Sequence, residues 1–354
     1  MAGLYSWLRQ ILSALPPEAA HRLTIRALGA GLLPDGQEAD DPLLRTRVWG
    51  LEFPNPIGLS AGFDKDAEVY AALLRFGFGF VEVGSITPQP QAGNPKPRVF
   101  RLPEDEAVIN RLGFNSAGLA AAVTNLRRRR TERAGIVGVN LGKNRDSADA
   151  AADYAAGTAA LAPVADYLVI NVSSPNTPGL RALQEAAALG KLLAQVRTAR
   201  HAAVPERPPP LLLKIAPDLA PADRRDIAEV ALAGGVDGLI IGNTTTGRPA
   251  DLRGRHAREG GGLSGRPLFA LSTDVLRDIY RLTEGRLPLI GVGGVASGAD
   301  AYAKIRAGAS LVQLYTALIY HGPRLVGRIK RDLAACLRAD GFATVAAAVG
   351  ADHR

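Results

Sequence analysis

Residues 166–180 read DYLVINVSSPNTPGL, a short apolar run followed directly by a polar loop. Asp166–Ile170 has the length and composition of a buried strand. Two prolines and a glycine then prevent an immediate helix, so the chain must cross the strand's end as a loop. Asn171 and Asn176 can each donate and accept hydrogen bonds, which suits a ligand with amide or imide edges. A turn held by its own Asn and Ser hydrogen bonds explains this loop equally well.

The same unit of apolar run and loop recurs from residue 56 onward. Eight such runs alternate with helical patterns, which predicts an α/β protein with a (β/α)8 TIM barrel. The predicted strands are Pro56–Ser60, Phe78–Gly84, Ile136–Leu141, Asp166–Val172, Leu211–Ile215, Val236–Gly242, Leu287–Val292 and Ser310–Tyr315. The helical patterns include Asp66–Phe76, Leu183–Arg200, Pro221–Ala233 and Ser297–Ala307. We assign the barrel domain to residues 37–354.

Residues 1–36 form a separate N-terminal segment. Apolar residues repeat at helical spacing on both sides of Pro16-Pro17, which predicts a helical hairpin extension followed by a glycine-containing linker. Arg9 and Pro16 interrupt any secretory signal, and no apolar run approaches the roughly 20 residues of a membrane span. Two interpretations remain: a hairpin that caps the barrel, or an amphipathic hairpin in the membrane interface with Trp7 at the headgroups.

Composition excludes several classes of protein. With 354 residues, 47% hydrophobic and 21% charged, the chain is globular and large enough for one extensive core. The net charge of +8 favours anionic ligands or an anionic membrane surface. Aromatic residues make up only 5%, and we interpret the one basic run, Arg127–Arg130, as a helix end, so no nucleic acid is predicted. A single cysteine, Cys336, and five unclustered histidines predict neither disulfide nor metal site.

Polar residues and glycines follow the predicted strands where a barrel places its chemistry. These positions are Ala61–Lys65, Ser85, Asn140, Asn171–Asn176, Lys214, Asn243-Thr244, Gly293-Gly294 and Tyr315-Thr316. Asp64 is the only acidic residue among them, which argues against paired-carboxylate hydrolysis and carboxylate–metal chemistry. The glycines of Gly291–Gly294 let backbone N–H groups approach an anion, and Tyr315-Thr316 open the last βα loop. A phosphorylated ligand is therefore expected.

Ten blocks of sequence together closely resemble dihydroorotate dehydrogenase, the flavin enzyme of pyrimidine synthesis. They are NPIGLSAGFDKDAE (55–68), VEVGSITPQPQAGNPKPRVFRL (81–102), INRLGFNS (109–116), GVNLGKN (138–144), NVSSPNTPGLR (171–181), LLLKIAPDL (211–219), GNTT (242–245), GGLSGRPL (261–268), IGVGGV (290–295) and GASLVQLYTALIYHGP (308–323). The family has a soluble class with a cysteine base and a membrane-associated, quinone-reducing class with a serine base. Ser174 and the N-terminal extension both indicate the quinone-dependent class.

The resemblance implies an FMN site and a dihydroorotate site. The implied FMN residues are Ala61, Gly62, Phe63, Asp64, Lys65, Ser85, Asn140, Asn171, Lys214, Gly242, Gly265, Gly294, Tyr315 and Thr316. The implied dihydroorotate residues are Lys65, Asn110, Arg111, Leu112, Gly113, Phe114, Asn171, Asn176, Asn243 and Thr244. Lys214 would stabilise charge at the flavin N1/O2 edge, and Lys65 would neutralise the substrate carboxylate. Gly242 replaces the Thr of many relatives, so its FMN contact could come only from backbone.

The resemblance also implies how the reaction proceeds. Ser174 would take a proton from C5 as C6 delivers hydride to flavin N5. A free serine is a poor base, so it needs a relay through water or a neighbouring hydroxyl. A quinone tunnel would pass His21, Arg101 and Tyr315, although His21 alone reads as an exposed helix histidine.

The expected function is oxidation of (S)-dihydroorotate to orotate through FMN, with a membrane quinone as acceptor, in de novo pyrimidine (UMP) biosynthesis. The protein is expected to be a monomer, peripheral on the cytoplasmic side of the cell membrane. Three alternatives stay open. They are another FMN barrel acting on a dihydropyrimidine or tRNA dihydrouridine, a Schiff-base aldolase using Lys214, and a non-catalytic phosphate-binding barrel.

Overall fold

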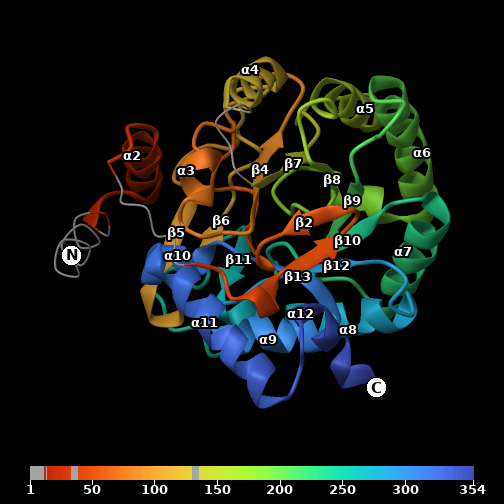
Figure 1. Cartoon of the computed structure of the whole chain (residues 1–354). Coiled ribbons are helices and arrows are strands. Elements are labelled where there is room, and N and C mark those ends of the chain that lie inside the picture. The colour runs from red at the N-terminus through yellow and green to blue at the C-terminus, as the bar shows by residue number, and fades with distance from the viewer. Residues whose placement is uncertain (1–11, 13, 33–38, 130–134) are drawn as a thin grey trace.

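The computed structural model describes residues 12, 14–32, 39–129 and 135–354. Eight parallel strands close a barrel in the order β10-β12-β13-β3-β4-β7-β8-β9 (Figure 1). They are β3 Ile57–Leu59, β4 Phe80–Ile86, β7 Ile136–Leu141, β8 Tyr167–Asn171, β9 Leu211–Ile215, β10 Gly238–Ile241, β12 Leu289–Val292 and β13 Ala309–Leu314. All eight predicted strands are present, so the prediction of a (β/α)8 barrel is confirmed.

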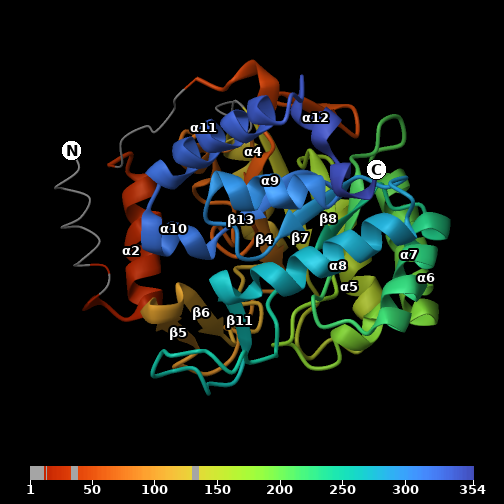
Figure 2. The same cartoon turned by 90° about the horizontal axis from the view of Figure 1, so that it is seen from below.

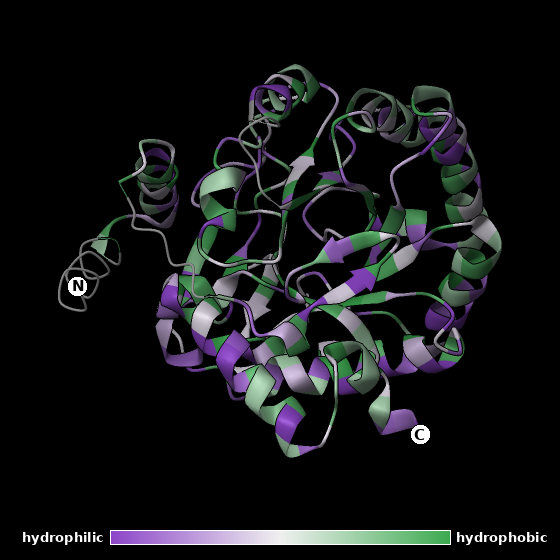
Figure 3. Cartoon of the chain, viewed as in Figure 1, coloured by the Kyte–Doolittle hydropathy of each residue, from purple (hydrophilic) through white to green (hydrophobic). Residues whose placement is uncertain are grey.

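Helices follow the barrel strands and cover them from outside. They are α3 Tyr70–Leu74, α4 Leu119–Arg129, α5 Ala150–Leu161, α6 Ala186–Ala203, α7 Pro221–Gly234, α8 Phe269–Leu282, α9 Gly298–Arg306, α10 Thr316–His321, α11 Arg324–Ala339 and α12 Val345–Ala348. Figure 3 shows hydrophilic and hydrophobic residues on the same outer helices, as expected for helices with one face against the barrel.

The first of these helices is shorter than the predicted Asp66–Phe76. The Asp64 carboxylate accepts backbone N–H groups of Glu68 at 2.7 Å and Val69 at 2.8 Å. These bonds hold the segment as a loop, so α3 begins only at Tyr70.

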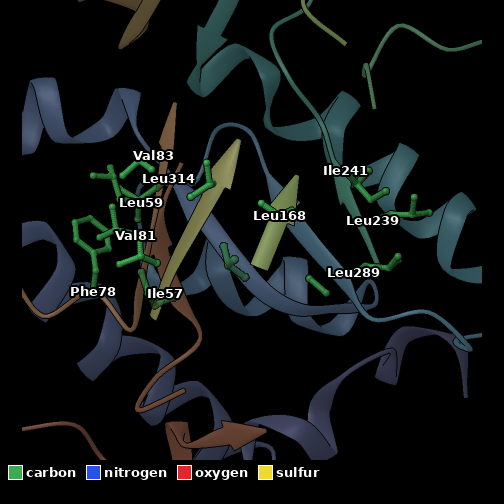
Figure 4. Close-up of a cluster of buried hydrophobic side chains, with 14 of the residues drawn as sticks. Ile57, Leu59, Phe78, Val81, Val83, Leu168, Leu239, Ile241, Leu289 and Leu314 are labelled. Atoms are coloured by element: carbon green, nitrogen blue, oxygen red, sulfur yellow. The ribbon is translucent and has the colours of Figure 1, made fainter. Parts of the chain in front are cut away.

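Strand side chains alternate between the helical layer and the barrel interior. Those that face the helices form the main apolar core, part of which Figure 4 shows: Ile57, Leu59, Phe78, Val81, Val83, Leu168, Leu239, Ile241, Leu289 and Leu314. A second cluster fills the amino-terminal half of the interior: Phe80, Ile136, Tyr167, Val169, Leu212, Ile240, Ile290 and Leu311.

A hairpin closes the amino-terminal end of the barrel. It consists of β1 Thr46–Val48 and β2 Leu51–Phe53, and it was not among the predicted elements. The buried ring of Phe53 lies 5.4 Å from that of Phe80, and Trp49 Nε1 donates to the Asp237 carbonyl at 2.6 Å. Because this end is filled, a ligand can enter the barrel only from the carboxyl ends of the strands.

A small antiparallel sheet stands outside the barrel beside that open end (Figure 2). Its strands are β5 Val99–Leu102, β6 Ala107–Asn110 and β11 Gly262–Gly265. The first two belong to the connection after β4, and the third to the connection after β10. Sequence patterns did not predict this sheet, although its strands carry Arg101, Asn110 and Gly265.

The N-terminal segment contributes α2, Pro17–Gly29, which packs against β5 and α3 (Figures 1 and 2). Arg98 Nη2 and Nε donate to Glu18 Oε1 at 2.8 and 3.1 Å and hold this helix to the connection after β4. The second predicted N-terminal helix is thus confirmed. Most of the first lies outside the described residues, so the hairpin as a whole stays a prediction. In the described part of the chain, no helix has both the length and the apolar character that crossing a membrane requires.

Candidate active site

A polar layer lies inside the barrel, above the apolar cluster that fills its amino-terminal half. Glu82, which is fully buried on β4, accepts from Asn140 Nδ2 at 2.8 Å and from Gln313 Nε2 at 2.6 Å. Lys214 Nζ lies 3.8 Å from Glu82 Oε1 and donates to Ser60 Oγ at 3.2 Å. The layer therefore joins four strands, and the residue that follows β3, through one carboxylate and one ammonium group.

Amide side chains continue this layer toward the strand ends. Asn171 Nδ2 donates to Ser85 Oγ at 3.0 Å and to Asn140 Oδ1 at 3.1 Å, and the Ser85 hydroxyl also donates to Asn140 Oδ1. Asn171 Oδ1 accepts from Ser173 Oγ at 2.9 Å. Each of these side chains is oriented by at least one neighbour, so the floor of the site is preorganised.

A cavity of about 2000 Å³ opens above this floor and extends to α2. Most of the predicted site residues line it. They are Ala61, Gly62, Phe63, Lys65, Ser85, Asn110, Leu112, Gly113, Phe114, Asn171, Ser174, Asn176, Lys214, Gly242, Asn243, Thr244, Gly265, Gly294, Tyr315 and Thr316, together with His21 and Arg101. Segments from both halves of the chain therefore meet in one continuous space.

Three predicted site residues do not line the cavity. Asp64 is buried beneath it, where burial raises its pKa to about 6, and it holds the loop before α3. Asn140 lies in the polar layer, where it orients Ser85 and Asn171. Arg111 turns outward to Glu259 at 2.9 Å. In this structure their side chains support the walls of the cavity. None of the three is among the residues that line it, so their predicted contacts with a ligand stay a prediction.

Two lysines bring positive charge to the cavity. Burial lowers the pKa of Lys65 to about 8. Burial also lowers the pKa of Lys214, and the nearby Glu82 carboxylate opposes that shift. An anionic ligand in the cavity would therefore stabilise the charged form of both lysines.

The loop after β8 carries Ser174 into the cavity. Ser174 Oγ accepts the backbone N–H of Asn176 at 3.3 Å, and Asn243 Nδ2 donates to Ser173 Oγ at 2.9 Å. Three residues beyond Ser174, the buried Thr177 hydroxyl has no hydrogen-bond partner among the residues that the structure describes.

Arg181 fastens this loop to its neighbours. Its guanidinium donates to the carbonyls of Ser173 and Thr244, both at 3.0 Å, and to Asp218 Oδ2 at 2.8 Å. Asp218 in turn accepts from the Thr245 hydroxyl. A single side chain thus sets the relative positions of the loops that follow β8, β9 and β10.

The turn after β12 has the backbone conformation of an anion cradle. Gly293 and Gly294 have φ of +108° and +74°, which side chains other than glycine rarely adopt. A Cβ on Gly294 would lie 2.5 Å from Cβ of Phe269. Thr316 Oγ1, at the neighbouring strand end, donates to Ser264 Oγ at 2.8 Å. Among the residues that the structure describes, the N–H groups of Gly293 and Gly294 donate to no backbone carbonyl, so they can approach an anion.

The cavity changes character as it approaches α2. His21 and Phe63 meet edge to face at 5.2 Å, and Phe63 meets Tyr315 in the same way at 5.6 Å. Burial lowers the pKa of His21 to about 4, so its imidazole is neutral at neutral pH. Arg101 donates to the carbonyls of Leu12, at 3.0 Å, and Leu15. An aromatic path therefore links the N-terminal segment to the last barrel strand.

Comparison with known proteins identifies the family. The family profile described as dihydroorotate dehydrogenase matches residues 43–337. The chain belongs to the dihydroorotate dehydrogenase family. The resemblance seen in the ten sequence blocks is thereby confirmed.

Individual relatives show to which class of this family the chain is most similar. The chain is 61% identical to dihydroorotate dehydrogenase (quinone) of Xanthobacter autotrophicus over 99% of both chains. It is 56% identical to the mitochondrial dihydroorotate dehydrogenase (quinone) of Mus musculus, over 96% of this chain and 88% of the mouse protein. The crystal structure of the Eimeria tenella enzyme with ferulenol matches with a TM-score of 0.92 and 46% identity over 96% of each chain. The prediction of the quinone-dependent class is confirmed.

Sequence reasoning about this family missed three side chains that organise the site. Glu82 lies within a strand pattern that reads as apolar, FVEVG, and a charged residue there was the available signal. Arg181 ends one of the matched blocks but was assigned no role. Arg98 could be interpreted only once α2 was seen to bring Glu18 beside it.

Proposed function

We propose that the chain oxidises (S)-dihydroorotate to orotate with FMN as bound cofactor and a membrane quinone as electron acceptor. One observation carries this proposal: a single cavity joins a floor of amides and ammonium groups to an aromatic path beside α2. Membership of the dihydroorotate dehydrogenase family supports the polar substrate, and the relatives named for quinone support the acceptor. The product would enter de novo synthesis of UMP.

The residues present fit FMN. The positive φ values of Gly293 and Gly294 and the adjacent Thr316 suit a phosphate, while Gly242, with φ of +112°, can offer only backbone. When bound, FMN supplies hydride uptake from one substrate and electron transfer to the other. Lys214 would stabilise negative charge at the cofactor's edge, because its ammonium is buried and held in place by Ser60.

The dihydroorotate would lie between the FMN and the loop after β8. Lys65 would neutralise its carboxylate, since burial already disfavours an unpaired ammonium there. Amides would match the donor and acceptor edges of the ring. The proposed contacts are Asn110, Arg111, Leu112, Gly113, Phe114, Asn171, Asn176, Asn243 and Thr244, of which Arg111 would act by holding the wall.

Ser174 would act as the base that accepts the proton from C5 of the substrate. Ser174 lines the cavity, and its loop is fixed by Arg181. The Thr177 hydroxyl, buried and without a partner among the described residues, is the group we propose for passing that proton onward. It would supply the neighbouring hydroxyl that a serine base needs.

The quinone would approach along α2. Neutral His21 can donate one ring N–H to a quinone oxygen, and Arg101 holds the carbonyls that precede α2. We assign residues 1–36 to a membrane- and quinone-binding segment and residues 37–354 to the FMN barrel. We further propose a monomer that binds peripherally to the cytoplasmic side of the cell membrane. If deletion of residues 1–33 leaves quinone turnover and membrane binding intact, this part of the proposal is wrong.

An anaerobic titration with dihydroorotate tests the central proposal. The purified protein should be yellow, bleach in proportion to added dihydroorotate, and regain its colour when a quinone is added. A colourless protein, or a flavin that ignores dihydroorotate, would overturn the assignment.

A further inference from the structure

Lys304 is a buried lysine that the proposed reaction does not use. It lies on α9, its side chain is fully buried, and it is not part of the cavity lining. Among the residues that the structure describes it forms no ion pair, and Asp300 and Asp274 favour its charge only at longer range. Burial lowers its pKa to about 7. Burying an ammonium group destabilises the fold unless hydrogen bonds or nearby charges compensate for its loss of water.

One hydrogen-bond chain connects this lysine to the glycine turn after β12. Lys304 Nζ donates to Ser272 Oγ at 2.7 Å. The Ser272 hydroxyl lies within donating distance of the Gly293 carbonyl, at 3.1 Å, and of the Phe269 carbonyl, at 3.2 Å. In its charged form Lys304 can only donate, so the ammonium forces the single hydroxyl proton of Ser272 toward one of these carbonyls.

The orientation of the Gly293–Gly294 peptide follows from that contact. In a trans peptide the C=O and N–H bonds point in opposite directions. The Gly293 carbonyl turns toward Ser272 on α8, whereas Gly293 and Gly294 both line the cavity. The N–H of Gly294 therefore points away from α8, to the cavity side of the turn.

The packing leaves this turn little freedom to reorient. A Cβ on Gly293 would lie 2.7 Å from Ser272 Oγ, and a Cβ on Gly294 would lie 2.5 Å from Cβ of Phe269. Lys304 Nζ itself lies 5.1 Å from the centre of the Phe269 ring. The first turn of α8 is thus wedged between the buried ammonium and the glycine turn.

We infer that Lys304 is a positioning residue for the phosphate of FMN, acting through Ser272 on the Gly293–Gly294 peptide. The ammonium fixes the proton of Ser272, Ser272 fixes the Gly293 carbonyl, and the opposite N–H is presented to the phosphate. Its buried positive charge also favours an anion at the turn. This inference rests on the proposed FMN cofactor.

The test compares FMN with riboflavin, which has the same ring system but no phosphate. The flavin-loaded protein is equilibrated with a mixture of the two, and the bound flavins are released and quantified. Lys304→Met should lower the preference for FMN about ten- to a hundredfold, the effect expected for losing a charge-assisted hydrogen bond. Ser272→Ala should lower it in the same direction.

Lys330→Met is the matched control. Lys330 is also a buried lysine, but it pairs with Asp40 at 2.7 Å, away from the glycine turn. Its loss should leave the preference for FMN unchanged.

Three outcomes are decisive. An unchanged preference in Lys304→Met, or an equal loss of affinity for both flavins, would overturn the inference. If Lys304→Met does not fold, an unchanged preference in Ser272→Ala would overturn it. A wild-type protein that binds neither flavin would instead overturn the proposed function.

Discussion

Lys214 Nζ lies 3.8 Å from Glu82 Oε1 in the closed interior of the barrel, one layer above the buried ring of Phe80. Phe80 and Glu82 are two residues apart on β4, so they project to the same side of the strand. The carboxylate is satisfied by Asn140 and Gln313 and offsets part of the desolvation of the lysine. The carboxylate thus favours the charged form of Lys214, whose ammonium group lies at the floor of the cavity.

Lys214→Met should make the midpoint potential of the bound flavin more negative by about 30–60 mV. The loss of one charge-assisted contact, about 1.5–3 kcal/mol, falls on the reduced form, which carries the negative charge. Redox titration of the FMN-loaded variant measures this shift. An unchanged potential would show that Lys214 supports the fold only.

Ser174→Ala should retain FMN but slow flavin reduction by dihydroorotate about 10²- to 10⁴-fold, the usual contribution of a general base. Stopped-flow absorbance measures the rate. Thr177→Val keeps the shape of the side chain, and we expect a smaller slowing in the same step, with reoxidation by quinone unaffected. Reduction at the wild-type rate in Ser174→Ala would remove this serine from the mechanism.

Orotate binding should weaken as the pH rises above about 8. Burial lowers the pKa of Lys65 to about 8, so the ammonium that pairs with the carboxylate is present below this pH and is lost above it. The dissociation constant of orotate should be flat near neutral pH and then rise toward tenfold per pH unit. Titration of the flavin spectrum with orotate measures it. Lys65→Met should bind weakly without this pH dependence, and the idea fails if the wild type shows none.

Glu18→Gln should impair flavin reoxidation by quinone and leave flavin reduction by dihydroorotate unchanged. Glu18 receives both bonds from the buried Arg98, so its loss loosens α2 from the barrel. We expect roughly a tenfold rise in KM for quinone, as for the loss of a charged hydrogen bond. Glu52→Gln removes an exposed ion pair with Arg47 and should change neither half-reaction. Equal slowing of both half-reactions would contradict a role confined to α2.

Local patterns in the sequence determined the barrel. Most strands are short apolar runs that end beside a glycine or a polar residue, and such runs can be recognised without knowing their partners. The segment 166–180 thus predicted both β8 and the loop that carries Ser174. The same reasoning located Lys214 near a strand end, because Leu211–Ile215 is apolar apart from this lysine.

The direction of individual side chains was decided only by the tertiary structure. Asp64 and Asn140 stand in matched blocks, yet one caps a loop and the other braces Ser85 and Asn171. Spacing along the chain locates a residue but does not tell whether its polar atoms meet a ligand or the backbone.

Pairings between distant segments also required the fold. Asn110 pairs with both Val99 and Gly262, and no local pattern marks strands whose partners lie so far apart in sequence. The contacts between Lys304 and Ser272 and between Glu18 and Arg98 likewise join segments that are distant in the sequence. The sequence by itself determined which strands and loops form the site, because those signals are local. Only the closed barrel decided which buried charges share a layer, because that depends on strand register and on the helices packed behind it.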